Sequence, residues 1–143
     1  MIIKELFSSD IDTVVKVQRD FSDGWNYNQL KSAFEGGRFH ILSAQDDSGY
    51  VGFLCYSVAM DESDIETVFV VSEKRRRGIA KLLIESAEKS LLKTGVNKVF
   101  LEVRESNAPA RALYERLGYN FLSQRKNYYQ DGENAVVMVK ELL

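Results

Sequence analysis

The spacing of apolar residues changes midway along the chain, and this change limits the possible folds more than any other feature. Between Arg38 and Val71, strand-like runs follow one another with only short turns between them. Strands connected so closely pair antiparallel. After Gly78, helical and strand-like segments alternate, and two strands joined by one helix lie parallel with a right-handed crossover. The sequence therefore predicts an α/β (α+β) domain with a mixed sheet, antiparallel at its start and parallel in its middle.

Helix-capping residues and turns mark the ends of the individual elements. Ser8-Ser9-Asp10 precedes apolar residues at helical spacing, and Gly95 and Gly118 end two later helices. An acidic turn over Asp61–Asp64 separates two strands. The predicted strands are 2–7, 38–45, 50–60, 65–71, 98–104, 119–129 and 134–141, and the predicted helices are 11–21, 26–36, 78–95 and 106–118, in the order βααβββαβαββ.

The composition excludes several kinds of chemistry. A chain of 143 residues has the usual size of one domain, so we expect a single domain over residues 1–143. Cys55 is the only cysteine and His40 the only histidine, which excludes an internal disulfide and a zinc site built from several such ligands. A Ser-His-Asp triad would have to use His40. We therefore expect chemistry based on carboxylates, hydroxyls, amines, backbone dipoles or a cofactor, with no metal.

Charge and hydropathy argue against two classes of partner. The formal net charge of -2 at pH 7 gives no general attraction to nucleic acid or to an anionic membrane. The first residues lack the apolar stretch of a secretion signal, and no window approaches the roughly 20 apolar residues of a membrane span. We therefore expect a cytoplasmic protein with no nucleic-acid or membrane partner, present as a monomer or a weak dimer.

The segment from Val70 to Ala80 combines the features of an anion-binding loop. An apolar strand ends, the basic run Lys74–Arg77 follows, and a helix begins at Gly78. Unpaired N–H groups at a helix N-terminus bind anions, and a glycine lets the backbone approach a ligand closely. Arginine adds forked donors that suit phosphate oxygens. A solvated basic loop or a small nucleic-acid patch is the alternative, but the strand–loop–glycine–helix order favours a pyrophosphate cradle.

Two residues are candidates for acid–base chemistry, and each also has an ordinary structural interpretation. Glu102 interrupts the apolar strand 98–104, where an unpaired buried carboxylate would be costly. It could be a functional carboxylate, or it could form an ion pair with Arg104 on the same face of the strand or with another local partner. Tyr114 lies in the apolar stripe of a predicted helix, so it could be a core residue or a proton donor. The residues alone leave both choices open.

The motif Arg75-x-x-Gly78-x-Ala80 resembles the Arg/Gln-x-x-Gly-x-Gly/Ala signature of the GNAT superfamily of acyl-CoA-dependent N-acetyltransferases. The predicted element order is also that of this superfamily. The resemblance implies that the sheet opens between its fourth and fifth strands and that acetyl-CoA fills the gap. Backbone N–H groups would bind the pyrophosphate, and the pantetheine arm would pair with a strand edge. The implied cofactor-binding residues are Val68, Phe69, Val70, Arg75, Arg76, Arg77, Gly78, Ile79, Ala80 and Lys81.

The stretch from Leu101 to Tyr119 resembles one branch of that superfamily, the bacterial ribosomal-protein-alanine N-acetyltransferases. Arg125–Tyr129 extends the similarity toward the C-terminus. Phe21–Trp25 is similar to the entrance segment of the branch, with Gly24 where proline is usual. The motif of the branch assigns roles to three residues: a general base at Glu102, a general acid at Tyr114 and a cofactor contact at Asn107.

These roles fit the chemistry of acetyl transfer. The attacking amine must be neutral, so a carboxylate can take its proton, and a phenol can protonate the departing thiolate. We expect transfer of an acetyl group from acetyl-CoA to a protein N-terminal α-amine, in particular the N-terminal alanine of a small ribosomal-subunit protein. The attack is expected to be direct, in a ternary complex without an acyl-enzyme, which makes Cys55 and His40 dispensable.

Two other functions remain open at this stage. A GNAT enzyme could acetylate lysine side chains, polyamines or another small amine, and pocket residues that one sequence does not reveal would decide. A non-catalytic acyl-CoA-binding domain could instead regulate a partner, although the presence of both Glu102 and Tyr114 argues against it. Tyr128 and Tyr129 could line a peptide channel or be surface aromatics of a hairpin.

Overall fold

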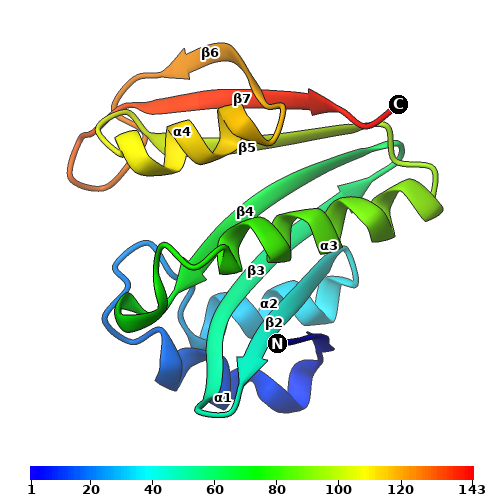
Figure 1. The fold of residues 1–143 in the computed structure, drawn as a ribbon, viewed down its shortest axis with the longest axis vertical. Helices are drawn as coiled ribbons and strands as arrows, with labels where there is room; N and C mark the ends of the chain where they lie inside the picture. Colours follow the sequence, from blue (N-terminus) through cyan, green and yellow to red (C-terminus); the bar gives the residue numbers. More distant parts are fainter.

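The computed structural model describes residues 1–143 as helices packed on a seven-stranded mixed sheet (Figure 1). The strand order is β1-β2-β3-β4-β5-β7-β6, and only the β4–β5 pair is parallel. The predicted element order and the change in strand direction are confirmed. The elements are β1 (Ile2–Leu6), η1 (Ser8–Asp10), α1 (Ile11–Val17), α2 (Tyr27–Gly36), β2 (Phe39–Asp46), β3 (Gly49–Ala59), β4 (Glu62–Val70), η2 (Ser72–Lys74), α3 (Ile79–Lys93), β5 (Lys98–Arg104), α4 (Ala108–Arg116), β6 (Asn120–Arg125) and β7 (Ala135–Glu141).

Alternating side chains of the central strands form two cores on opposite faces of the sheet. Leu42 and Leu54 belong to the core that includes the apolar side of α3, whereas Ile41 and Phe53 belong to the core beneath α1 and α2. This alternation follows from the two-residue period of a strand, which sends neighbouring side chains to opposite faces. The helices α1 and α2 therefore cover one face of the sheet, and α3 covers the other.

The strands β4 and β5 pair only over a short stretch, from Glu62 opposite Lys98 to Ile65 opposite Leu101. Beyond Ile65 they separate, and their ribbons diverge in Figure 1 toward the end of β4 that leads into α3. In this region β4 still pairs with β3, and β5 pairs along its whole length with β7. The predicted opening of the sheet between its fourth and fifth strands is confirmed.

The predicted acidic turn before β4 is wrong in its extent. The turn is confined to Met60 and Asp61, and the strand already begins at Glu62. The buried hydroxyl of Ser63 donates a hydrogen bond of 2.7 Å to the carbonyl of Ser57 on β3. A buried hydroxyl needs a hydrogen-bond partner, and here the neighbouring strand provides it. The polar start of β4 can therefore be part of the sheet.

Two other predicted elements are shorter than expected. The helix α1 ends at Val17, and the next side chain, that of Gln18, turns to donate a hydrogen bond of 2.9 Å to the carbonyl of Trp25. The strand β6 ends at Arg125. All six of its residues are exposed, so no buried face favours a longer strand. Both shortened elements leave loops beside the opening between β4 and β5.

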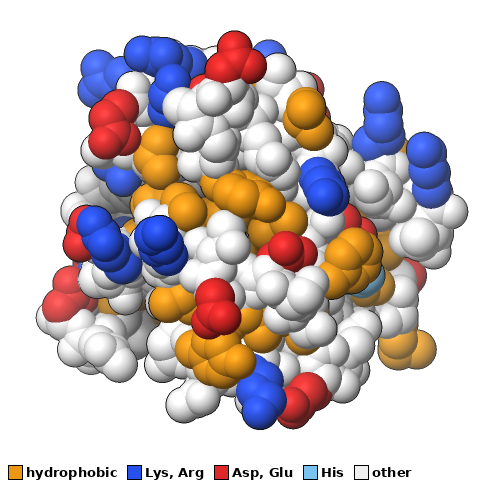
Figure 2. Space-filling model, turned by 90° about the horizontal axis from the view of Figure 1, so that it is seen from below, with side chains coloured by type: hydrophobic (Ala, Val, Ile, Leu, Met, Phe, Trp, Pro, Cys, Tyr) orange, Lys and Arg blue, Asp and Glu red, His pale blue; other side chains and the backbone are white.

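The surface carries its apolar residues in patches. On the face shown in Figure 2, apolar side chains lie across the middle, and most Lys and Arg side chains lie nearer the margin. None of the helices is both long and apolar enough to span a lipid bilayer.

Candidate active site

A groove of about 1160 Å³ lies where β4 and β5 separate. Its walls are the two strands, the start of α3, one side of α4, and the loops that precede α2 and β7. Arg77 is exposed and is the one predicted site residue outside this lining. The groove brings together the other predicted residues: Val68, Phe69, Val70, Arg75, Arg76, Gly78, Ile79, Ala80, Lys81, Glu102, Asn107 and Tyr114.

One end of the groove presents a row of free backbone donors. The six consecutive amides from Arg76 to Lys81 donate no hydrogen bond within the protein, and the first intrahelical bond of α3 runs from Leu82 to Gly78. Arg76 and Gly78 have positive φ angles of 63° and 80°, which turn the chain into a concave loop. Such a loop, followed by a helix N-terminus, forms an anion-binding site. The amide row therefore fits a pyrophosphate.

Two side chains hold this loop in place. Arg75 Nε donates a hydrogen bond of 3.0 Å to the carbonyl of Val70, and Lys74 Nζ lies 3.2 Å from Asp46 Oδ2 at the end of β2. Hydrogen bonds from Ser48 and the nearby Lys74 ammonium lower the pKa of Asp46 to about 2, so this carboxylate stays charged. Arg75 thus shapes the loop through the backbone of β4, a role that its place in the sequence motif does not reveal.

The edge of β4 next to the amide row has no strand partner. Residues 68–70 pair with β3 on one side, whereas the pairing with β5 has already ended at Ile65. An extended ligand can add to such an edge through backbone hydrogen bonds. The backbone of Val68, Phe69 and Val70 is thus available to an arm that extends from the pyrophosphate site.

Glu102 lines the groove one residue beyond Leu101, where the pairing of β4 and β5 ends, and is largely buried, with 19% of its side chain exposed. Burial raises the pKa of this carboxyl, the Arg125 guanidinium 3.3 Å from Oε1 lowers it, and the Asp64 carboxylate raises it. The alternative of a local Glu102–Arg104 pair is wrong, because Arg104 bonds to other carboxylates. Glu102 is therefore a partly desolvated carboxyl group with one exposed cation beside it.

Tyr114 belongs both to the core and to the lining of the groove. The side chain is buried and packs edge-on against Tyr119, with ring centroids 6.1 Å apart. Its hydroxyl makes no hydrogen bond within the protein, and the residue lines the groove. Burial raises the pKa of this phenol to about 12. Tyr114 is consequently protonated at neutral pH and has a free hydroxyl to donate.

Asn107 begins α4, the helix that carries Tyr114. Its Oδ1 accepts a hydrogen bond of 3.2 Å from the amide of Ala110, and Pro109 occupies the first turn. An asparagine cap and an early proline both favour a helix start at this point. Asn107 therefore fixes the end of α4 at the groove while its side-chain NH₂ group has no partner in the protein.

Aromatic and charged side chains line the opposite end of the groove. Phe21 stacks on Phe69 of β4 with ring centroids 5.2 Å apart. Tyr128 and Tyr129 come from the loop between β6 and β7, and both line the groove, although Tyr128 is also exposed at the surface of the hairpin. The ring of Tyr129 lies 4.1 Å from the guanidinium carbon of Arg104.

Gly24 fits tightly into the loop before α2. Its amide donates a hydrogen bond of 3.0 Å to the carbonyl of Phe21, which a proline could not make. A Cβ atom at this position would lie 3.1 Å from side-chain atoms of Gln18 and of Phe21. In this chain the segment is therefore held by the backbone hydrogen bond from Gly24 to Phe21 and by the side-chain hydrogen bond from Gln18 to Trp25.

Sequence reasoning missed two carboxylates near Glu102. Glu66 on β4 lines the groove, accepts a hydrogen bond of 2.9 Å from Ser57 Oγ, and has a pKa raised by burial and by Asp64 and Glu102. Asp64 also has a pKa raised by burial. The strand β4 begins with polar residues, among them Asp64 and Glu66, so no break in an apolar run of the kind that marks Glu102 distinguishes Glu66 in the sequence.

Cys55 and His40 lie outside the lining of the groove. Cys55 is in the core beneath α1 and α2, where burial raises the pKa of its thiol to about 12. His40 Nδ1 lies 3.2 Å from Glu5 Oε2, and its ring stacks on Tyr56. No group of three or more His, Cys, Asp or Glu side chains is arranged to hold a metal ion.

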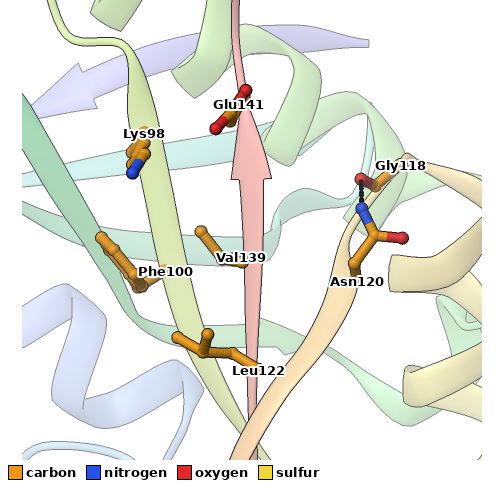
Figure 3. A pocket seen from close by; sticks show the side chains of 7 residues that line it. All are labelled: Lys98, Phe100, Gly118, Asn120, Leu122, Val139 and Glu141. Atoms are coloured by element: carbon orange, nitrogen blue, oxygen red, sulfur yellow. Dashed lines mark hydrogen bonds between the residues drawn. The ribbon is translucent and has the colours of Figure 1, made fainter.

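A smaller cavity of about 360 Å³ lies further along the same sheet (Figure 3). Phe100, Leu122 and Val139 point toward it from three neighbouring strands, with Lys98 and Glu141 at one end. It contains none of the predicted site residues, and it is separate from the groove.

The profile of the Acetyltransferase (GNAT) family matches residues 4–119. The chain therefore belongs to the GNAT family and is an acetyl-transferring enzyme, as the resemblance in its sequence implied. The opening between β4 and β5 and the amide row at α3 are features of that fold in this chain.

Relatives place the chain within this class. It is 32% identical over 142 residues to the ribosomal protein bS18-alanine N-acetyltransferase of Haemophilus influenzae, with 96% of each protein covered. The crystal structure of the ribosomal-protein-S18-alanine N-acetyltransferase from Escherichia coli matches with a TM-score of 0.90 at 30% identity, over 99% of this chain and 93% of that one. Arabidopsis thaliana NAA60 in complex with acetyl-CoA matches with a TM-score of 0.86 at 21% identity, over 98% and 97%, which shows the fold alone.

Proposed function

We propose that residues 1–143 act as one acetyl-CoA-dependent domain that acetylates the N-terminal α-amine of a protein. The proposed acceptor is a ribosomal protein with an N-terminal alanine, which is the acceptor named for the bacterial relatives. The observation that carries the proposal is one groove with free amides at one end and Glu102 and Tyr114 at its centre. We further propose that the protein acts in the cytoplasm, as a monomer or a weak dimer.

Acetyl-CoA, when bound, supplies the thioester that donates the acetyl group. The amides of Arg76 to Lys81 fit its pyrophosphate, because all six lack partners in the protein. The free edge of β4 suits an amide-containing arm, and the unpartnered NH₂ group of Asn107 can donate to it. These contacts use the backbone for most of the recognition, so they depend little on the side chains of the loop.

Glu102 and Tyr114 are the proposed acid–base pair. The carboxylate of Glu102 takes a proton from the acceptor ammonium, which frees the nitrogen lone pair for attack on the acetyl carbon. As the new C–N bond forms and the C–S bond breaks, the Tyr114 hydroxyl protonates the thiolate, and the second proton that the nitrogen loses restores the phenol. The raised pKa of the Glu102 carboxyl suits the uptake of a proton, and the protonated phenol of Tyr114 suits the donation of one.

The position of the only thiol supports direct transfer to the acceptor. Cys55 lies in the core outside the groove, and its raised pKa of about 12 keeps it protonated. An α-amine with a pKa of about 8 is also easier to deprotonate than a lysine with a pKa of about 10.4. Both points favour a peptide N-terminus that attacks acetyl-CoA in a ternary complex.

The test is a comparison of matched peptides with acetyl-CoA, read as thiol release and by mass spectrometry of the acetylated atom. The set contains an Ala-initiated peptide, the same peptide with a blocked N-terminus and an internal lysine, and a polyamine. We expect turnover of the free α-amine alone. Turnover confined to lysine or polyamine would replace the proposed acceptor, and acetyl-CoA binding without any turnover would favour a regulatory domain.

A further inference from the structure

Arg104 joins two loops that are far apart in the sequence. It lies at the end of β5, two residues after Glu102, with 22% of its side chain exposed. Its Nε and Nη2 donate hydrogen bonds of 2.8 Å to the two carboxylate oxygens of Asp23, in the loop before α2. Its Nη1 donates to Asp131 at 2.8 Å and to Glu133 at 2.9 Å, in the loop before β7.

Both loops form walls of the groove, and the first of them packs on the face of the sheet that α1 and α2 cover, opposite α3. Trp25 lies two residues after Asp23, and Tyr129 lies two residues before Asp131; both line the groove. The guanidinium also packs over the ring of Tyr129, at 4.1 Å. A forked cation with four hydrogen bonds fixes direction as well as distance, which a lysine in its place could not do.

The same network reaches the start of α4. Glu133 accepts from Arg104 through Oε1 and from the amide of Ser106 through Oε2, at 2.8 Å. Hydrogen bonds from Ser106 and Arg104 lower the pKa of Glu133 to about 2, so the carboxylate remains charged. The bridge therefore connects the two loops with the turn that leads to Asn107 and Tyr114.

We infer that Arg104 is a positioning residue that joins the loop at Asp23 to the loop at Asp131 and Glu133 and thereby builds the acceptor end of the groove. This inference rests on the proposed function for the identity of the acceptor. Because the contacts of Arg104 are with these two loops and not with the amide row of Arg76 to Lys81, the bridge controls binding of the acceptor peptide and leaves binding of acetyl-CoA unchanged.

Steady-state kinetics with both substrates test this role. Arg104→Lys keeps the charge but loses the fork, and Arg104→Met loses both; Arg19→Met, an exposed arginine of the same loop region, is the control. We expect the KM for the acceptor peptide to rise about tenfold or more in both Arg104 variants, because small misplacements at a site are costly. The KM for acetyl-CoA should remain that of the wild type, and kcat should fall less than the acceptor KM rises.

The single tryptophan, Trp25, gives a second measurement that needs no turnover. Arg104→Met and Asp23→Asn, which removes the charge of the Arg104 partner, should both increase acrylamide quenching of Trp25 fluorescence, whereas Arg19→Met should match the wild type. The double variant Arg104→Met/Asp23→Asn should add nothing to the larger single effect on the acceptor KM, because both changes break one connection.

Unchanged acceptor KM and unchanged Trp25 quenching in the Arg104 variants would overturn the inference, and so would equal increases in the KM values of both substrates. A wild-type protein that turns over no free-amine peptide would instead overturn the proposed function. In that case the fluorescence comparison would still decide whether Arg104 orders the loop.

Discussion

The two ends of the groove are constructed differently. The end at α3 is mainly backbone from one continuous segment, residues 68–81, and its donors are amides without partners. The other end is made of side chains from separate parts of the chain, held together by Arg104. A site made of backbone tolerates many side-chain changes, whereas a site made of side chains can be altered one residue at a time. Acetyl-CoA recognition and acceptor recognition should therefore respond to different substitutions.

Glu102 lies at the boundary between the two ends, and its loss should have the largest effect. Glu102→Gln removes the proposed base while it keeps the size of the side chain, so kcat should fall by about 100-fold or more. The affinity for acetyl-CoA, measured by calorimetry, should not change. Glu141→Gln, an exposed glutamate on β7, is the control and should keep full activity. Full activity of Glu102→Gln would remove this residue from the mechanism.

A glycine substitution in the loop before α3 should affect the acetyl-CoA end of the groove and spare the acceptor end. Gly78 has a φ of +80° and open space where a Cβ would be, so Gly78→Ala adds left-handed strain without a clash. We expect the KM for acetyl-CoA to rise about tenfold, because roughly 1–2 kcal/mol of strain opposes the loop conformation. The KM for the acceptor should stay the same.

Gly37 provides the matched control for that substitution. It has the same left-handed backbone, with a φ of +73°, and likewise has nothing within 4 Å of a Cβ, but it ends α2 and lies outside the groove. Gly37→Ala should lower thermal stability by a similar amount and leave both KM values unchanged. An equal rise of the acetyl-CoA KM in both variants would show that strain, rather than the amide row, causes the effect.

The pH dependence should respond in opposite directions to two changes around Glu102. Arg125 favours the charged carboxylate and Asp64 disfavours it. Arg125→Met should therefore raise the pKa of Glu102 and shift the acid limb of log(kcat/KM) to higher pH, because the base must be deprotonated. Asp64→Asn should lower the pKa and shift the limb to lower pH. Lys126→Met is the control, and titration of the acceptor amine cancels in the comparison.

Shifts of the same sign in both variants, or no shift in either, would mean that another group limits the rate at low pH. The bridge at Arg104 should not contribute to these profiles, because Glu133 has a pKa lowered to about 2 and stays charged over the assay range.

The smallest effect on activity is expected at the only thiol. Cys55→Ala should leave kcat and both KM values unchanged, because the side chain is buried in the second core and has no part in a direct transfer. It should destabilise the fold by about 1–2 kcal/mol, as a cavity forms in a packed core. Loss of turnover without loss of folding would support an acyl-enzyme on Cys55 instead.

The difference between the two ends of the groove also explains how much of the site could be predicted from the sequence. The loop around Gly78 was predictable because a strand, a basic loop, a glycine and a helix follow one another in 11 residues, from Val70 to Ala80. The element order was predictable for the same reason, since turns and caps are local signals. Glu102 was recognisable because a carboxylate interrupts an apolar strand.

The acceptor end was not predictable in the same detail, because its contacts join distant residues. Asp23 and Arg104 are 81 residues apart, and neither has an unusual sequence context. The partner of Glu102 is Arg125 on another strand rather than Arg104, its neighbour on the same face. Ion pairs of this kind depend on the register of the sheet and on loop conformation, and local patterns carry no information about either.

Mapping of amide chemical shifts in the isotope-labelled protein tests the division of the groove most directly. Acetyl-CoA added alone should shift the amides of Arg76 to Lys81 and those along the free edge of β4. An Ala-initiated peptide added to the acetyl-CoA complex of Glu102→Gln should shift the Trp25 indole and the amides of residues 128–133. Shifts at Trp25 with acetyl-CoA alone, or none at residues 76–81, would contradict a groove with a backbone-made cofactor end and a side-chain-made acceptor end.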